Sequence, residues 1–235
     1  KKEIARRSGQ YEEMKSQFQN VSAKVKSLKE MIEKLEGFDR GVRFILEKKR
    51  AEPDKKGIYG VVAEMLETEP ELELAIEAVL GQKLQSVIVE STEQGLEAIQ
   101  CLKSFSAGRG TFIPLSLREL EACSIPEHLQ AKGVKPLREL IRVKPGFEAV
   151  VNYLLGSSVL VENMEQAIEL WKMNNFKGAF VTKDGIVLDR YGVLTGGSKE
   201  ETGFLTKKRE LKELSQVQET LSLKLKEVEQ EIREL

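Results

Sequence analysis

The sequence predicts an α+β protein in which two pseudo-symmetric α/β subdomains are flanked by an intramolecular antiparallel coiled coil. Three observations predict this fold: heptad repeats at both ends, a middle that alternates apolar helices with short β-type runs, and an internal repeat within that middle. The 235 residues suffice for one or two domains, and 32% of them are charged while only 6% are aromatic. This composition is typical of a chain that is partly long surface helix.

Composition narrows the class of protein. The sequence contains no run of about 20 apolar residues that could span a membrane and no signal peptide. It begins at Lys1 rather than Met, so we expect a piece of a longer protein. Two cysteines, Cys101 and Cys123, cannot form a disulfide framework and favour a reducing compartment. Since the formal charge is −1, affinity for polyanions must come from local patches.

Hydrophobic residues recur every 3.5 positions at both ends of the chain. The N-terminal seam consists of Ile4, Arg7, Tyr11, Met14, Phe18, Val21, Val25, Leu28, Ile32 and Leu35. The C-terminal seam consists of Phe204, Lys207, Leu211, Leu214, Gln218, Leu221, Leu225, Val228, Ile232 and Leu235. Seventeen of these twenty positions are apolar, which predicts coiled coil over roughly five heptads. The alternative is an amphipathic helix packed on a globular core.

The two helices are predicted to pair with each other. Each has about 35 residues and a length of about 50 Å. If Leu35 lies opposite Phe204 and the chains run antiparallel, every layer has a partner, and Gln218 falls opposite Val21. A slip of one heptad stays open.

Two stretches of the middle contain the same parts in the same order, residues 73–113 and residues 148–181. Each has an apolar helix that ends at a glycine, a buried strand that ends in Glu, a second helix, and a Gly-x-Phe strand. One unit alone would expose an apolar face, so we expect the two to pack with approximate two-fold symmetry. Coincidental similarity is the alternative.

Local signals predict the ends of the helices. Gly81 and Gly156 lie where a helix C-cap favours a left-handed residue. Ser91 and Asn163 are suitable N-caps for the helices that follow. Residues 184–198 read as a strand, a turn and a second short strand. The predicted domains are an N-terminal arm (1–37), a central domain (38–203, with subdomains 38–115 and 147–203 and a linker 116–146) and a C-terminal arm (204–235).

Motifs for catalysis and metal binding do not occur in the sequence. The P-loop pattern is not matched, and Gly57-x-x-Gly60 fits a strand with close backbone approach better than a dinucleotide fingerprint. The single histidine, His128, and two distant cysteines form neither a zinc ligand set nor a nucleophilic pair. Cys101 is interpreted as a small hydrophobe on a helix. We therefore expect no enzyme activity and no cofactor in this fragment.

Glycines in the last strand pair point to a contact with a second copy of the chain. Gly192, Gly196 and Gly197 remove side-chain bulk from an expected edge strand and let another backbone approach. A closed two-fold homodimer would cover such an edge. Alternatively, Gly196 and Gly197 only form a tight turn before the C-terminal helix.

Basic residues gather on both sides of the expected junction between domain and arms. The candidate DNA-binding residues are Lys48, Lys49, Arg50, Lys207, Lys208 and Arg209. Cations at a helix N-terminus oppose the helix dipole, so those that open the C-terminal helix do not stabilise it. Weak, salt-dependent contact with DNA phosphates at one neck is the functional interpretation. A solvated charged surface is the alternative.

The order coiled coil, doubled α/β unit, coiled coil resembles the hinge region of SMC proteins, the chromosome-organising ATPases, and looks closest to the bacterial members. The segments that carry the resemblance are GIYGVVAEML (Gly57–Leu66), AIEAVLG (Ala75–Gly81), GRGTFIPL (Gly108–Leu115), NYLLGSSVLVEN (Asn152–Asn163) and VTKDGIVLDRYGVLTGGS (Val181–Ser198). Together these segments are specific, and the resemblance covers nearly the whole chain.

The resemblance implies a homodimerisation hinge that joins two arms and supports chromosome condensation and segregation in the cytoplasm, at the nucleoid. ATP, Mg and accessory subunits would bind only at a head domain outside this chain, and no membrane contact is implied. The family's dimer glycines map onto Gly192, Gly196 and Gly197, but Tyr191 stands where a paired glycine is common. A lysine run that contacts DNA is here interrupted as Lys199-Glu200-Glu201. Two other functions stay open: a spacer that binds only protein partners, and a small-ligand enzyme on a stalk.

Overall fold

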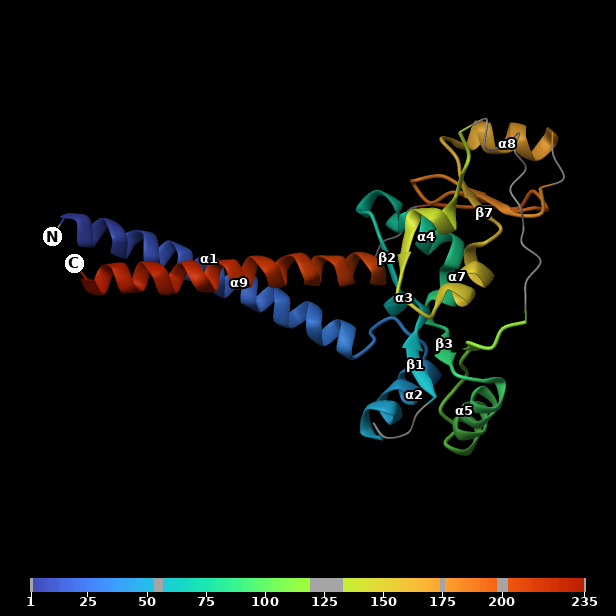
Figure 1. The fold of residues 1–235 in the computed structure, drawn as a ribbon, viewed down its shortest axis with the longest axis horizontal. Coiled ribbons are helices and arrows are strands. Elements are labelled where there is room, and N and C mark those ends of the chain that lie inside the picture. Colours follow the sequence, from blue (N-terminus) through green and yellow to red (C-terminus); the bar gives the residue numbers. More distant parts are fainter. Residues whose placement is uncertain (1, 53–56, 119–132, 174–175, 198–202, 235) are drawn as a thin grey trace. The chain divides into compact units, whose positions relative to one another are not determined.

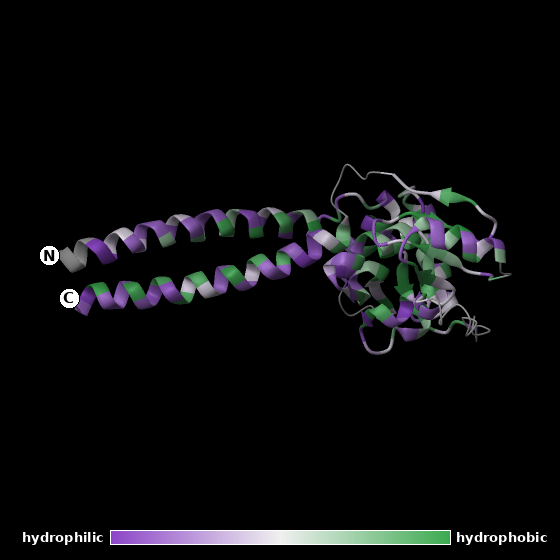
Figure 2. Ribbon diagram, turned by 90° about the horizontal axis from the view of Figure 1, so that it is seen from above, coloured by the Kyte–Doolittle hydropathy of each residue, from purple (hydrophilic) through white to green (hydrophobic). Residues whose placement is uncertain are grey.

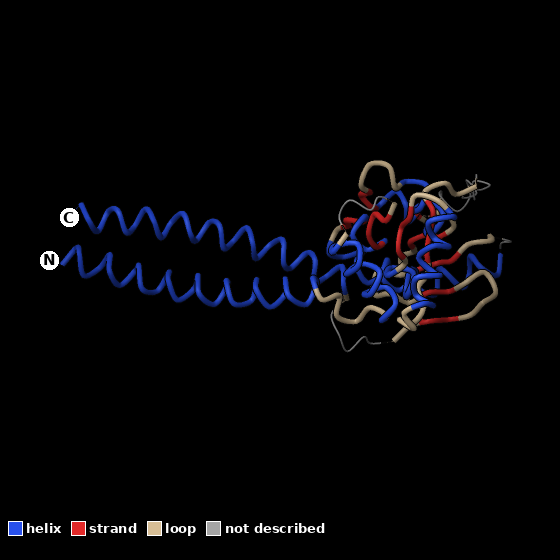
Figure 3. The backbone as a smooth tube through the Cα atoms, turned by 90° about the horizontal axis from the view of Figure 1, so that it is seen from below, coloured by secondary structure: helices blue, strands red, loops and turns tan. Residues whose placement is uncertain are grey.

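The computed structural model describes residues 2–52, 57–118, 133–173, 176–197 and 203–234. The chain forms two compact units. The first contains Lys1–Glu36 and Thr206–Leu235, and the second contains Gly37–Leu205. Within the described residues every strand belongs to the second unit (Figure 3). His128 and Cys123 lie outside the described residues.

The first unit is a pair of long antiparallel helices, α1 (Lys2–Glu33) and α9 (Phe204–Glu234), whose outer ends carry the two termini (Figure 1). Between Arg6 and Glu33 the half-buried side chains fall on the predicted seam, with only Ser8 and Ser22 added. From Leu211 onward in α9 the half-buried side chains likewise follow the seam, with Ser215 and Ser222 added. The predicted coiled coil is therefore confirmed.

Two polar contacts fix how the helices are aligned. Gln218 donates from Nε2 to Oγ of Ser22 at 3.0 Å, one residue from its predicted partner Val21. Near the termini, Arg7 Nη1 lies 2.9 Å from Oε2 of Glu231, the neighbour of Ile232, which the same alignment of the heptads places opposite Arg7. Both contacts agree with the antiparallel register inferred from the heptads, without the one-heptad slip.

The coiled coil ends earlier than the heptads predict. Helix α1 stops at Glu33, and Leu35 has a left-handed backbone, with φ of 52°. The amide of Leu35 donates to the carbonyl of Ile32 and that of Glu36 to the carbonyl of Met31, which is the hydrogen-bond pattern of a Schellman C-cap. Leu35 therefore lies beyond the end of the helix rather than in a regular coiled-coil layer, and Phe204 packs against Phe38 with 5.0 Å between the ring centroids.

The second unit begins with α2 (Arg40–Ala51) and then contains the two repeats. The first repeat comprises β1 (Ile58–Val61), α3 (Val62–Met65), β2 (Leu66–Thr68), η1 (Pro70–Leu72), α4 (Glu73–Leu80), η2 (Gly81–Gln85), β3 (Val87–Val89), α5 (Thr92–Ser104) and β4 (Phe112–Pro114). The second comprises β5 (Lys135–Pro136), η3 (Leu137–Leu140), β6 (Ile141–Val143), α7 (Glu148–Leu155), β7 (Ser158–Leu160), α8 (Met164–Met173) and β8 (Ala179–Val181), followed by β9 (Val187–Leu188) and β10 (Leu194–Thr195).

The two repeats form sheets with the same strand order and register. The first sheet has the order β1-β3-β4, and the second contains the matching order β5-β7-β8. Strand β3 runs parallel to β4 with Val87 opposite Phe112, and β7 runs parallel to β8 with Val159 opposite Phe180. These pairs are equivalent in the sequence repeat, so the internal repeat predicted from the sequence is real.

A short antiparallel pair joins the two repeats. In β2 and β6, Glu67 lies opposite Arg142, Leu66 opposite Val143, and Thr68 opposite Ile141. Exchanging the two strands reproduces the same pairs, as approximate two-fold symmetry requires. Strands β5 and β6 come from the end of the segment 116–146, which the sequence analysis assigned to a linker.

Strands and helices of the second unit contain its buried apolar residues, and Figure 2 shows hydrophobic stretches among these elements. One core cluster joins α8 to its sheet and contains Val134, Val159, Val161, Ala167, Leu170, Phe176, Phe180 and Leu188. Helix α5 packs on the first sheet in the equivalent way, and Gly95 lets it approach Phe112 and Val89. The long helices of the first unit are mainly hydrophilic (Figure 2).

The predicted caps are confirmed only in part. Gly81 ends α4 with φ of 49°, and Oδ1 of Asn163 accepts the amide of Gln166 at 2.8 Å. Gly156 ends α7 in a right-handed conformation, with φ of −59°, so its predicted left-handed cap is wrong. A side chain there would meet the carbonyl oxygen of Asn152, which explains the glycine. Ser91 is extended but makes no side-chain cap hydrogen bond.

No helix in the described parts of the chain has the length and hydropathy needed to cross a bilayer.

Candidate functional site

Strand β10 lies at one edge of the second sheet, whose order is β10-β9-β8-β7-β5. Among the described strands it pairs only with β9, with Leu194 opposite Leu188 and Thr195 opposite Val187. The turn that leads into it is shaped by Asp189, whose Oδ1 accepts the amides of Tyr191 at 2.8 Å and Val193 at 2.9 Å. The predicted strand, turn and strand are thus confirmed, and the turn presents β10 at the sheet edge.

This edge exposes apolar side chains. Tyr191 is 71% exposed, Val193 57% and Leu194 56%. Large hydrophobic side chains at an unpaired strand edge are typical of a surface that another strand covers. The border that the sequence predicted as a contact is therefore accessible within its own chain.

The three candidate glycines differ in what requires them. Gly192 has φ of 87°, and a Cβ on it would lie 2.7 Å from Cζ2 of Trp171, whose indole N–H donates to the carbonyl of Arg190 at 3.2 Å. A Cβ on Gly196 would lie 3.2 Å from Ile186, whereas Gly197 faces open space with φ of 131°. Gly192 is thus already required by packing within the chain. No contact with a second copy is described, so the dimer role of all three stays a prediction.

Two of the candidate cations on α2 make contacts within the second unit. Lys48 Nζ lies 3.4 Å from Sγ of Cys101 and 5.3 Å from the ring centroid of Phe105. Lys49 Nζ donates to the carbonyl of Tyr59 at 2.7 Å. Arg50 is exposed at the end of the same helix. The two lysines therefore have a structural role, which the sequence interpretation as a DNA surface did not foresee.

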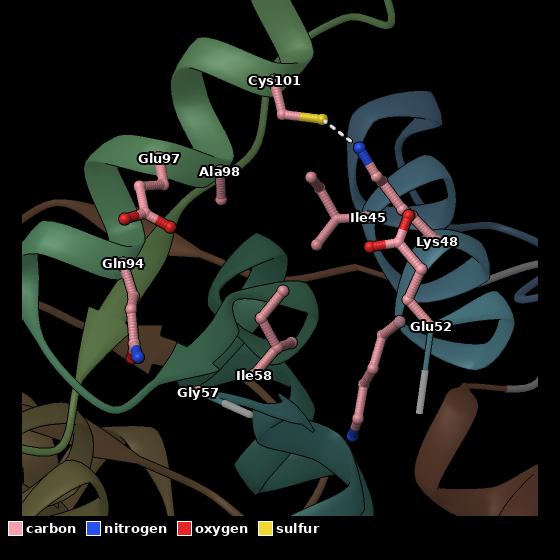
Figure 4. Close-up of a pocket in the computed structure, with 10 residues that line it drawn as sticks. Ile45, Lys48, Glu52, Gly57, Ile58, Gln94, Glu97, Ala98 and Cys101 are labelled. Atoms are coloured by element: carbon pink, nitrogen blue, oxygen red, sulfur yellow. Dashed lines mark hydrogen bonds between the residues drawn. The ribbon is translucent and has the colours of Figure 1, made fainter. Parts of the chain in front are cut away.

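A pocket lies between α2 and α5, and these two lysines form part of its wall (Figure 4). The lining residues are Ile45, Lys48, Lys49, Glu52, Gly57, Ile58, Gln94, Glu97, Ala98 and Cys101. A side chain on Gly57 would collide with the amide of Gln94, so the predicted close backbone approach at this glycine is confirmed. Within the described residues no group of three or more His, Cys, Asp or Glu side chains could hold a metal ion.

The candidate cations on α9 lie in its first two turns and are half-buried. Arg209 Nη1 lies 3.0 Å from Oε1 of Glu213, one turn further along the helix. Lys207 and Lys208 belong to the first unit, whereas Lys48 belongs to the second. The convergence of the two groups on one neck therefore stays a prediction.

Two exposed carboxyls have a lowered pKa. Lys183 Nζ lies 2.6 Å from Oε2 of Glu71, and this hydrogen bond with its charge attraction lowers the pKa of Glu71. A hydrogen bond from Ser91 lowers the pKa of Glu93 at the start of α5. The largest cause of each shift is a single neighbouring side chain, so the shifts reflect a local ion pair at Glu71 and a local hydrogen bond at Glu93.

Sequence reasoning missed a buried acid that reaches the start of α9. Glu77 on α4 is only 6% exposed, and its Oε1 accepts the amide of Leu205 at 2.9 Å. The sequence of α4 predicts an apolar helix. An acid at one of its buried positions was therefore the signal that could have indicated this contact. The residue equivalent to Glu77 in the second repeat is Asn152, which is also polar.

Known proteins are similar to this chain in sequence and in architecture. Residues 55–171 match the family described as the flexible hinge domain of SMC proteins. The chromosome partition protein Smc of Bacillus subtilis is 32% identical over 96% of this chain. The chain belongs to the SMC hinge family. The resemblance and the fold predicted from the sequence are thereby confirmed, and the flanking helices are the paired arms of this hinge.

Solved hinge structures agree with this assignment. The SMC hinge domain of Geobacillus stearothermophilus, solved as an asymmetric dimer, is 27% identical with a TM-score of 0.85, covering 99% of this chain and 94% of that one. The SMC hinge domain of Pyrococcus furiosus is 28% identical with a TM-score of 0.58, covering 78% of this chain and 92% of that one. The chain spans only about a fifth of the length of the curated Smc relatives.

Proposed function

We propose that this hinge joins two copies of its chain into a homodimer and thereby connects two coiled-coil arms. The relatives it matches are named chromosome partition proteins, and one similar hinge was solved as a dimer. In this proposal the full-length protein supports chromosome segregation and condensation in the cytoplasm. Its ATP and Mg sites, and the contacts of its accessory subunits, belong to head domains beyond this hinge.

One observation carries the proposal: the two sheets differ at the edge next to the equivalent strands β4 and β8. In the second sheet β8 is followed by β9 and β10, whereas in the first sheet the equivalent strand β4 is the last described strand. Strand β10, with its exposed Leu194, therefore needs a partner, and no described strand adjoins β4 as β9 adjoins β8. A two-fold dimer in which β10 of each copy meets β4 of the other satisfies both edges at once.

In the three-stranded and five-stranded sheets, the other two edges are already protected. Strand β1 has an irregular register at Tyr59, and Lys49 donates to the carbonyl of that residue. Bulges and lysines are common ways in which an edge strand avoids pairing. Strand β5 has only two residues, one of which is Pro136. Strands β4 and β10 thus remain as the pairing edges.

The experiment compares two leucines that are almost equally exposed. The chain should elute as a dimer of about 53 kDa by light scattering, twice its 26.5 kDa mass. Leu194→Glu on β10 (56% exposed) should yield monomer, because a charge cannot be buried between paired strands. Leu223→Glu on α9 (57% exposed) is the control and should remain dimeric. A wild-type monomer at all concentrations would support a coiled-coil spacer instead.

Substitution of Gly196 and Gly197 by Glu is a less specific test. Gly196 already lies against Ile186, and Gly197 has a left-handed φ, so both changes disturb the chain's own fold. They should dissociate the dimer, but Leu194→Glu does so without an internal clash. A monomer produced only by the glycine variants would indicate misfolding rather than a broken interface.

We also propose a weak contact with DNA phosphates at the neck between hinge and arms. The cationic first turns of α9 support it, because Lys207 and Lys208 do not serve the helix dipole there. The α2 lysines contribute less, since Lys48 and Lys49 are held by Cys101, Phe105 and Tyr59.

A small-ligand enzyme is the runner-up, and it would use the pocket between α2 and α5. A small molecule that raises the melting temperature in wild type but not in Gln94→Ala would favour it.

A further inference from the structure

We propose that Glu77 is a positioning residue of the hinge: its carboxylate holds the start of α9 on α4 and caps that helix from outside. The inference rests on the proposed role of the hinge in joining arms. It concerns the link between hinge and arm and is independent of the dimer contact.

Within the described residues, the start of α9 lacks the acidic and N-cap side chains that usually stabilise a helix start. The first amides of any helix lack partners within the helix, and acidic side chains near them are favourable. The first turn of α9 contains no acid, and the residue before it, Gly203, has no side chain to act as a cap. Lys207 and Lys208 follow at once, and their charges oppose the helix dipole.

The missing negative charge comes from another element. The Oε1 atom of Glu77 accepts the amide of Leu205 at 2.9 Å, within a buried contact. A buried carboxylate is costly unless hydrogen bonds and positive charge compensate for it. The N-terminus of α9 provides both, which explains why an acid is tolerated in the apolar helix α4.

Gly203 has a specific reason to lack a side chain. A Cβ on this residue would collide with the carboxylate of Glu77, so the acid occupies the space where an N-cap side chain would lie. Its backbone is not left-handed, so conformational freedom does not explain the glycine. Glu77 thus takes over the role of the N-cap from Gly203.

The same contact joins α9 to the centre of the second unit. Helix α4 packs against α7, β8 and β9, so it contacts both repeats. Phe204 and Leu205 belong to this unit, and Leu205 is only 5% exposed. Apolar contacts hold the helix start in place, whereas the directional hydrogen bond to Glu77 fixes its rotation.

The test separates capping from docking by moving the cap to α9 itself. Glu77→Ala removes both the cap and the link to α4. Adding Gly203→Asp to it restores a local cap, because Asp is a preferred N-cap residue and the space is then vacant. Nitroxide labels at Gln216 and Gln100, both exposed, report the distance between arm and hinge. The labelled chain carries Cys101→Ser and Cys123→Ser and is diluted into unlabelled chain.

We expect Glu77→Ala to broaden the distance distribution at least two-fold and to speed amide exchange in the first turn of α9 about 10-fold. The double variant should recover slow exchange while the distribution stays broad. A narrow distribution in either variant would overturn the proposal. If Glu77→Ala does not fold, Glu77→Gln keeps the acceptor oxygen and the side-chain shape but removes the charge, so exchange in the first turn of α9 should still become faster; unchanged exchange there would also count against the proposal.

Dimerisation should be unaffected, so this proposal and the proposed dimer fail in different ways. The mass of Glu77→Ala in solution should equal that of the wild-type chain. A monomeric wild type would contradict the dimer but leave the distance measurement valid, because both labels are on one chain.

Discussion

Among single residues, Gly192 lies in the turn before the exposed strand β10 and packs against Trp171. Its left-handed φ and its contact with Trp171 leave no room for a side chain. Gly192→Ala should destabilise the hinge by about 1–3 kcal/mol, the usual cost of backbone strain together with a displaced side chain. Urea denaturation at one fixed protein concentration measures the change.

The control for this substitution is Gly9, which lies in α1 with nothing within 4 Å of a Cβ. Gly9→Ala should leave stability unchanged or raise it by up to about 1 kcal/mol, because alanine favours helix over glycine. Equal stability of Gly192→Ala and the wild-type chain would show that the Trp171 contact does not constrain the turn.

At the level of helices and strands, periodic patterns could be predicted from the sequence, whereas unusual caps and contacts between residues far apart in the chain could not. The heptads gave the seam of α1 and α9, and the repeat gave the parallel strand pairs with the correct register. The end of α1 was missed because Leu35, not a glycine, takes the left-handed position of the cap. Glu77 was missed because its partner lies 128 residues away, and a pattern of neighbours carries no information about it.

For the candidate surfaces, strand order and exposure needed the structure. The sequence predicted the β9–β10 pair and its glycines, but it could not show that Gly192 packs on Trp171 of its own chain. It also assigned the α2 lysines to a DNA-binding surface, with a solvated charged surface as the alternative, whereas Lys48 and Lys49 contact Cys101 and Tyr59. Such contacts depend on how α2 packs on α5 and β1, which local sequence does not specify.

The polar layer of the coiled coil should fix its register. Gln218 bonds to Ser22 at the seam, and a polar seam residue typically costs stability while it selects one alignment. Gln218→Leu should therefore raise the melting temperature of the arm but permit a slip by one heptad. In wild type, cysteines at Val25 and Leu214 should form a disulfide, whereas cysteines at Val25 and Leu221 should not.

In the Gln218→Leu background the second cysteine pair should also become oxidised. Val228→Leu is the control, because it changes a seam residue without removing a polar contact, and it should keep only the first disulfide. If Gln218→Leu never yields the second disulfide, the apolar layers alone set the register.

The whole molecule has almost no net charge, with a formal value of −1 and a sequence pI of about 6.2, so its overall field does not attract DNA. Any affinity must come from a local group of cations and must fall steeply with salt. Lys207→Glu with Lys208→Glu should weaken binding to a short duplex and reduce the salt slope by about 2, roughly one unit for each lost phosphate contact. Fluorescence anisotropy across a series of KCl concentrations measures both quantities.

The control is Lys224→Glu with Lys226→Glu, at two exposed lysines further along α9. It changes the net charge equally and should leave the salt slope intact. An equal loss in both variants would indicate attraction to the helix as a whole, and an unchanged slope in the first would remove the neck as a DNA contact.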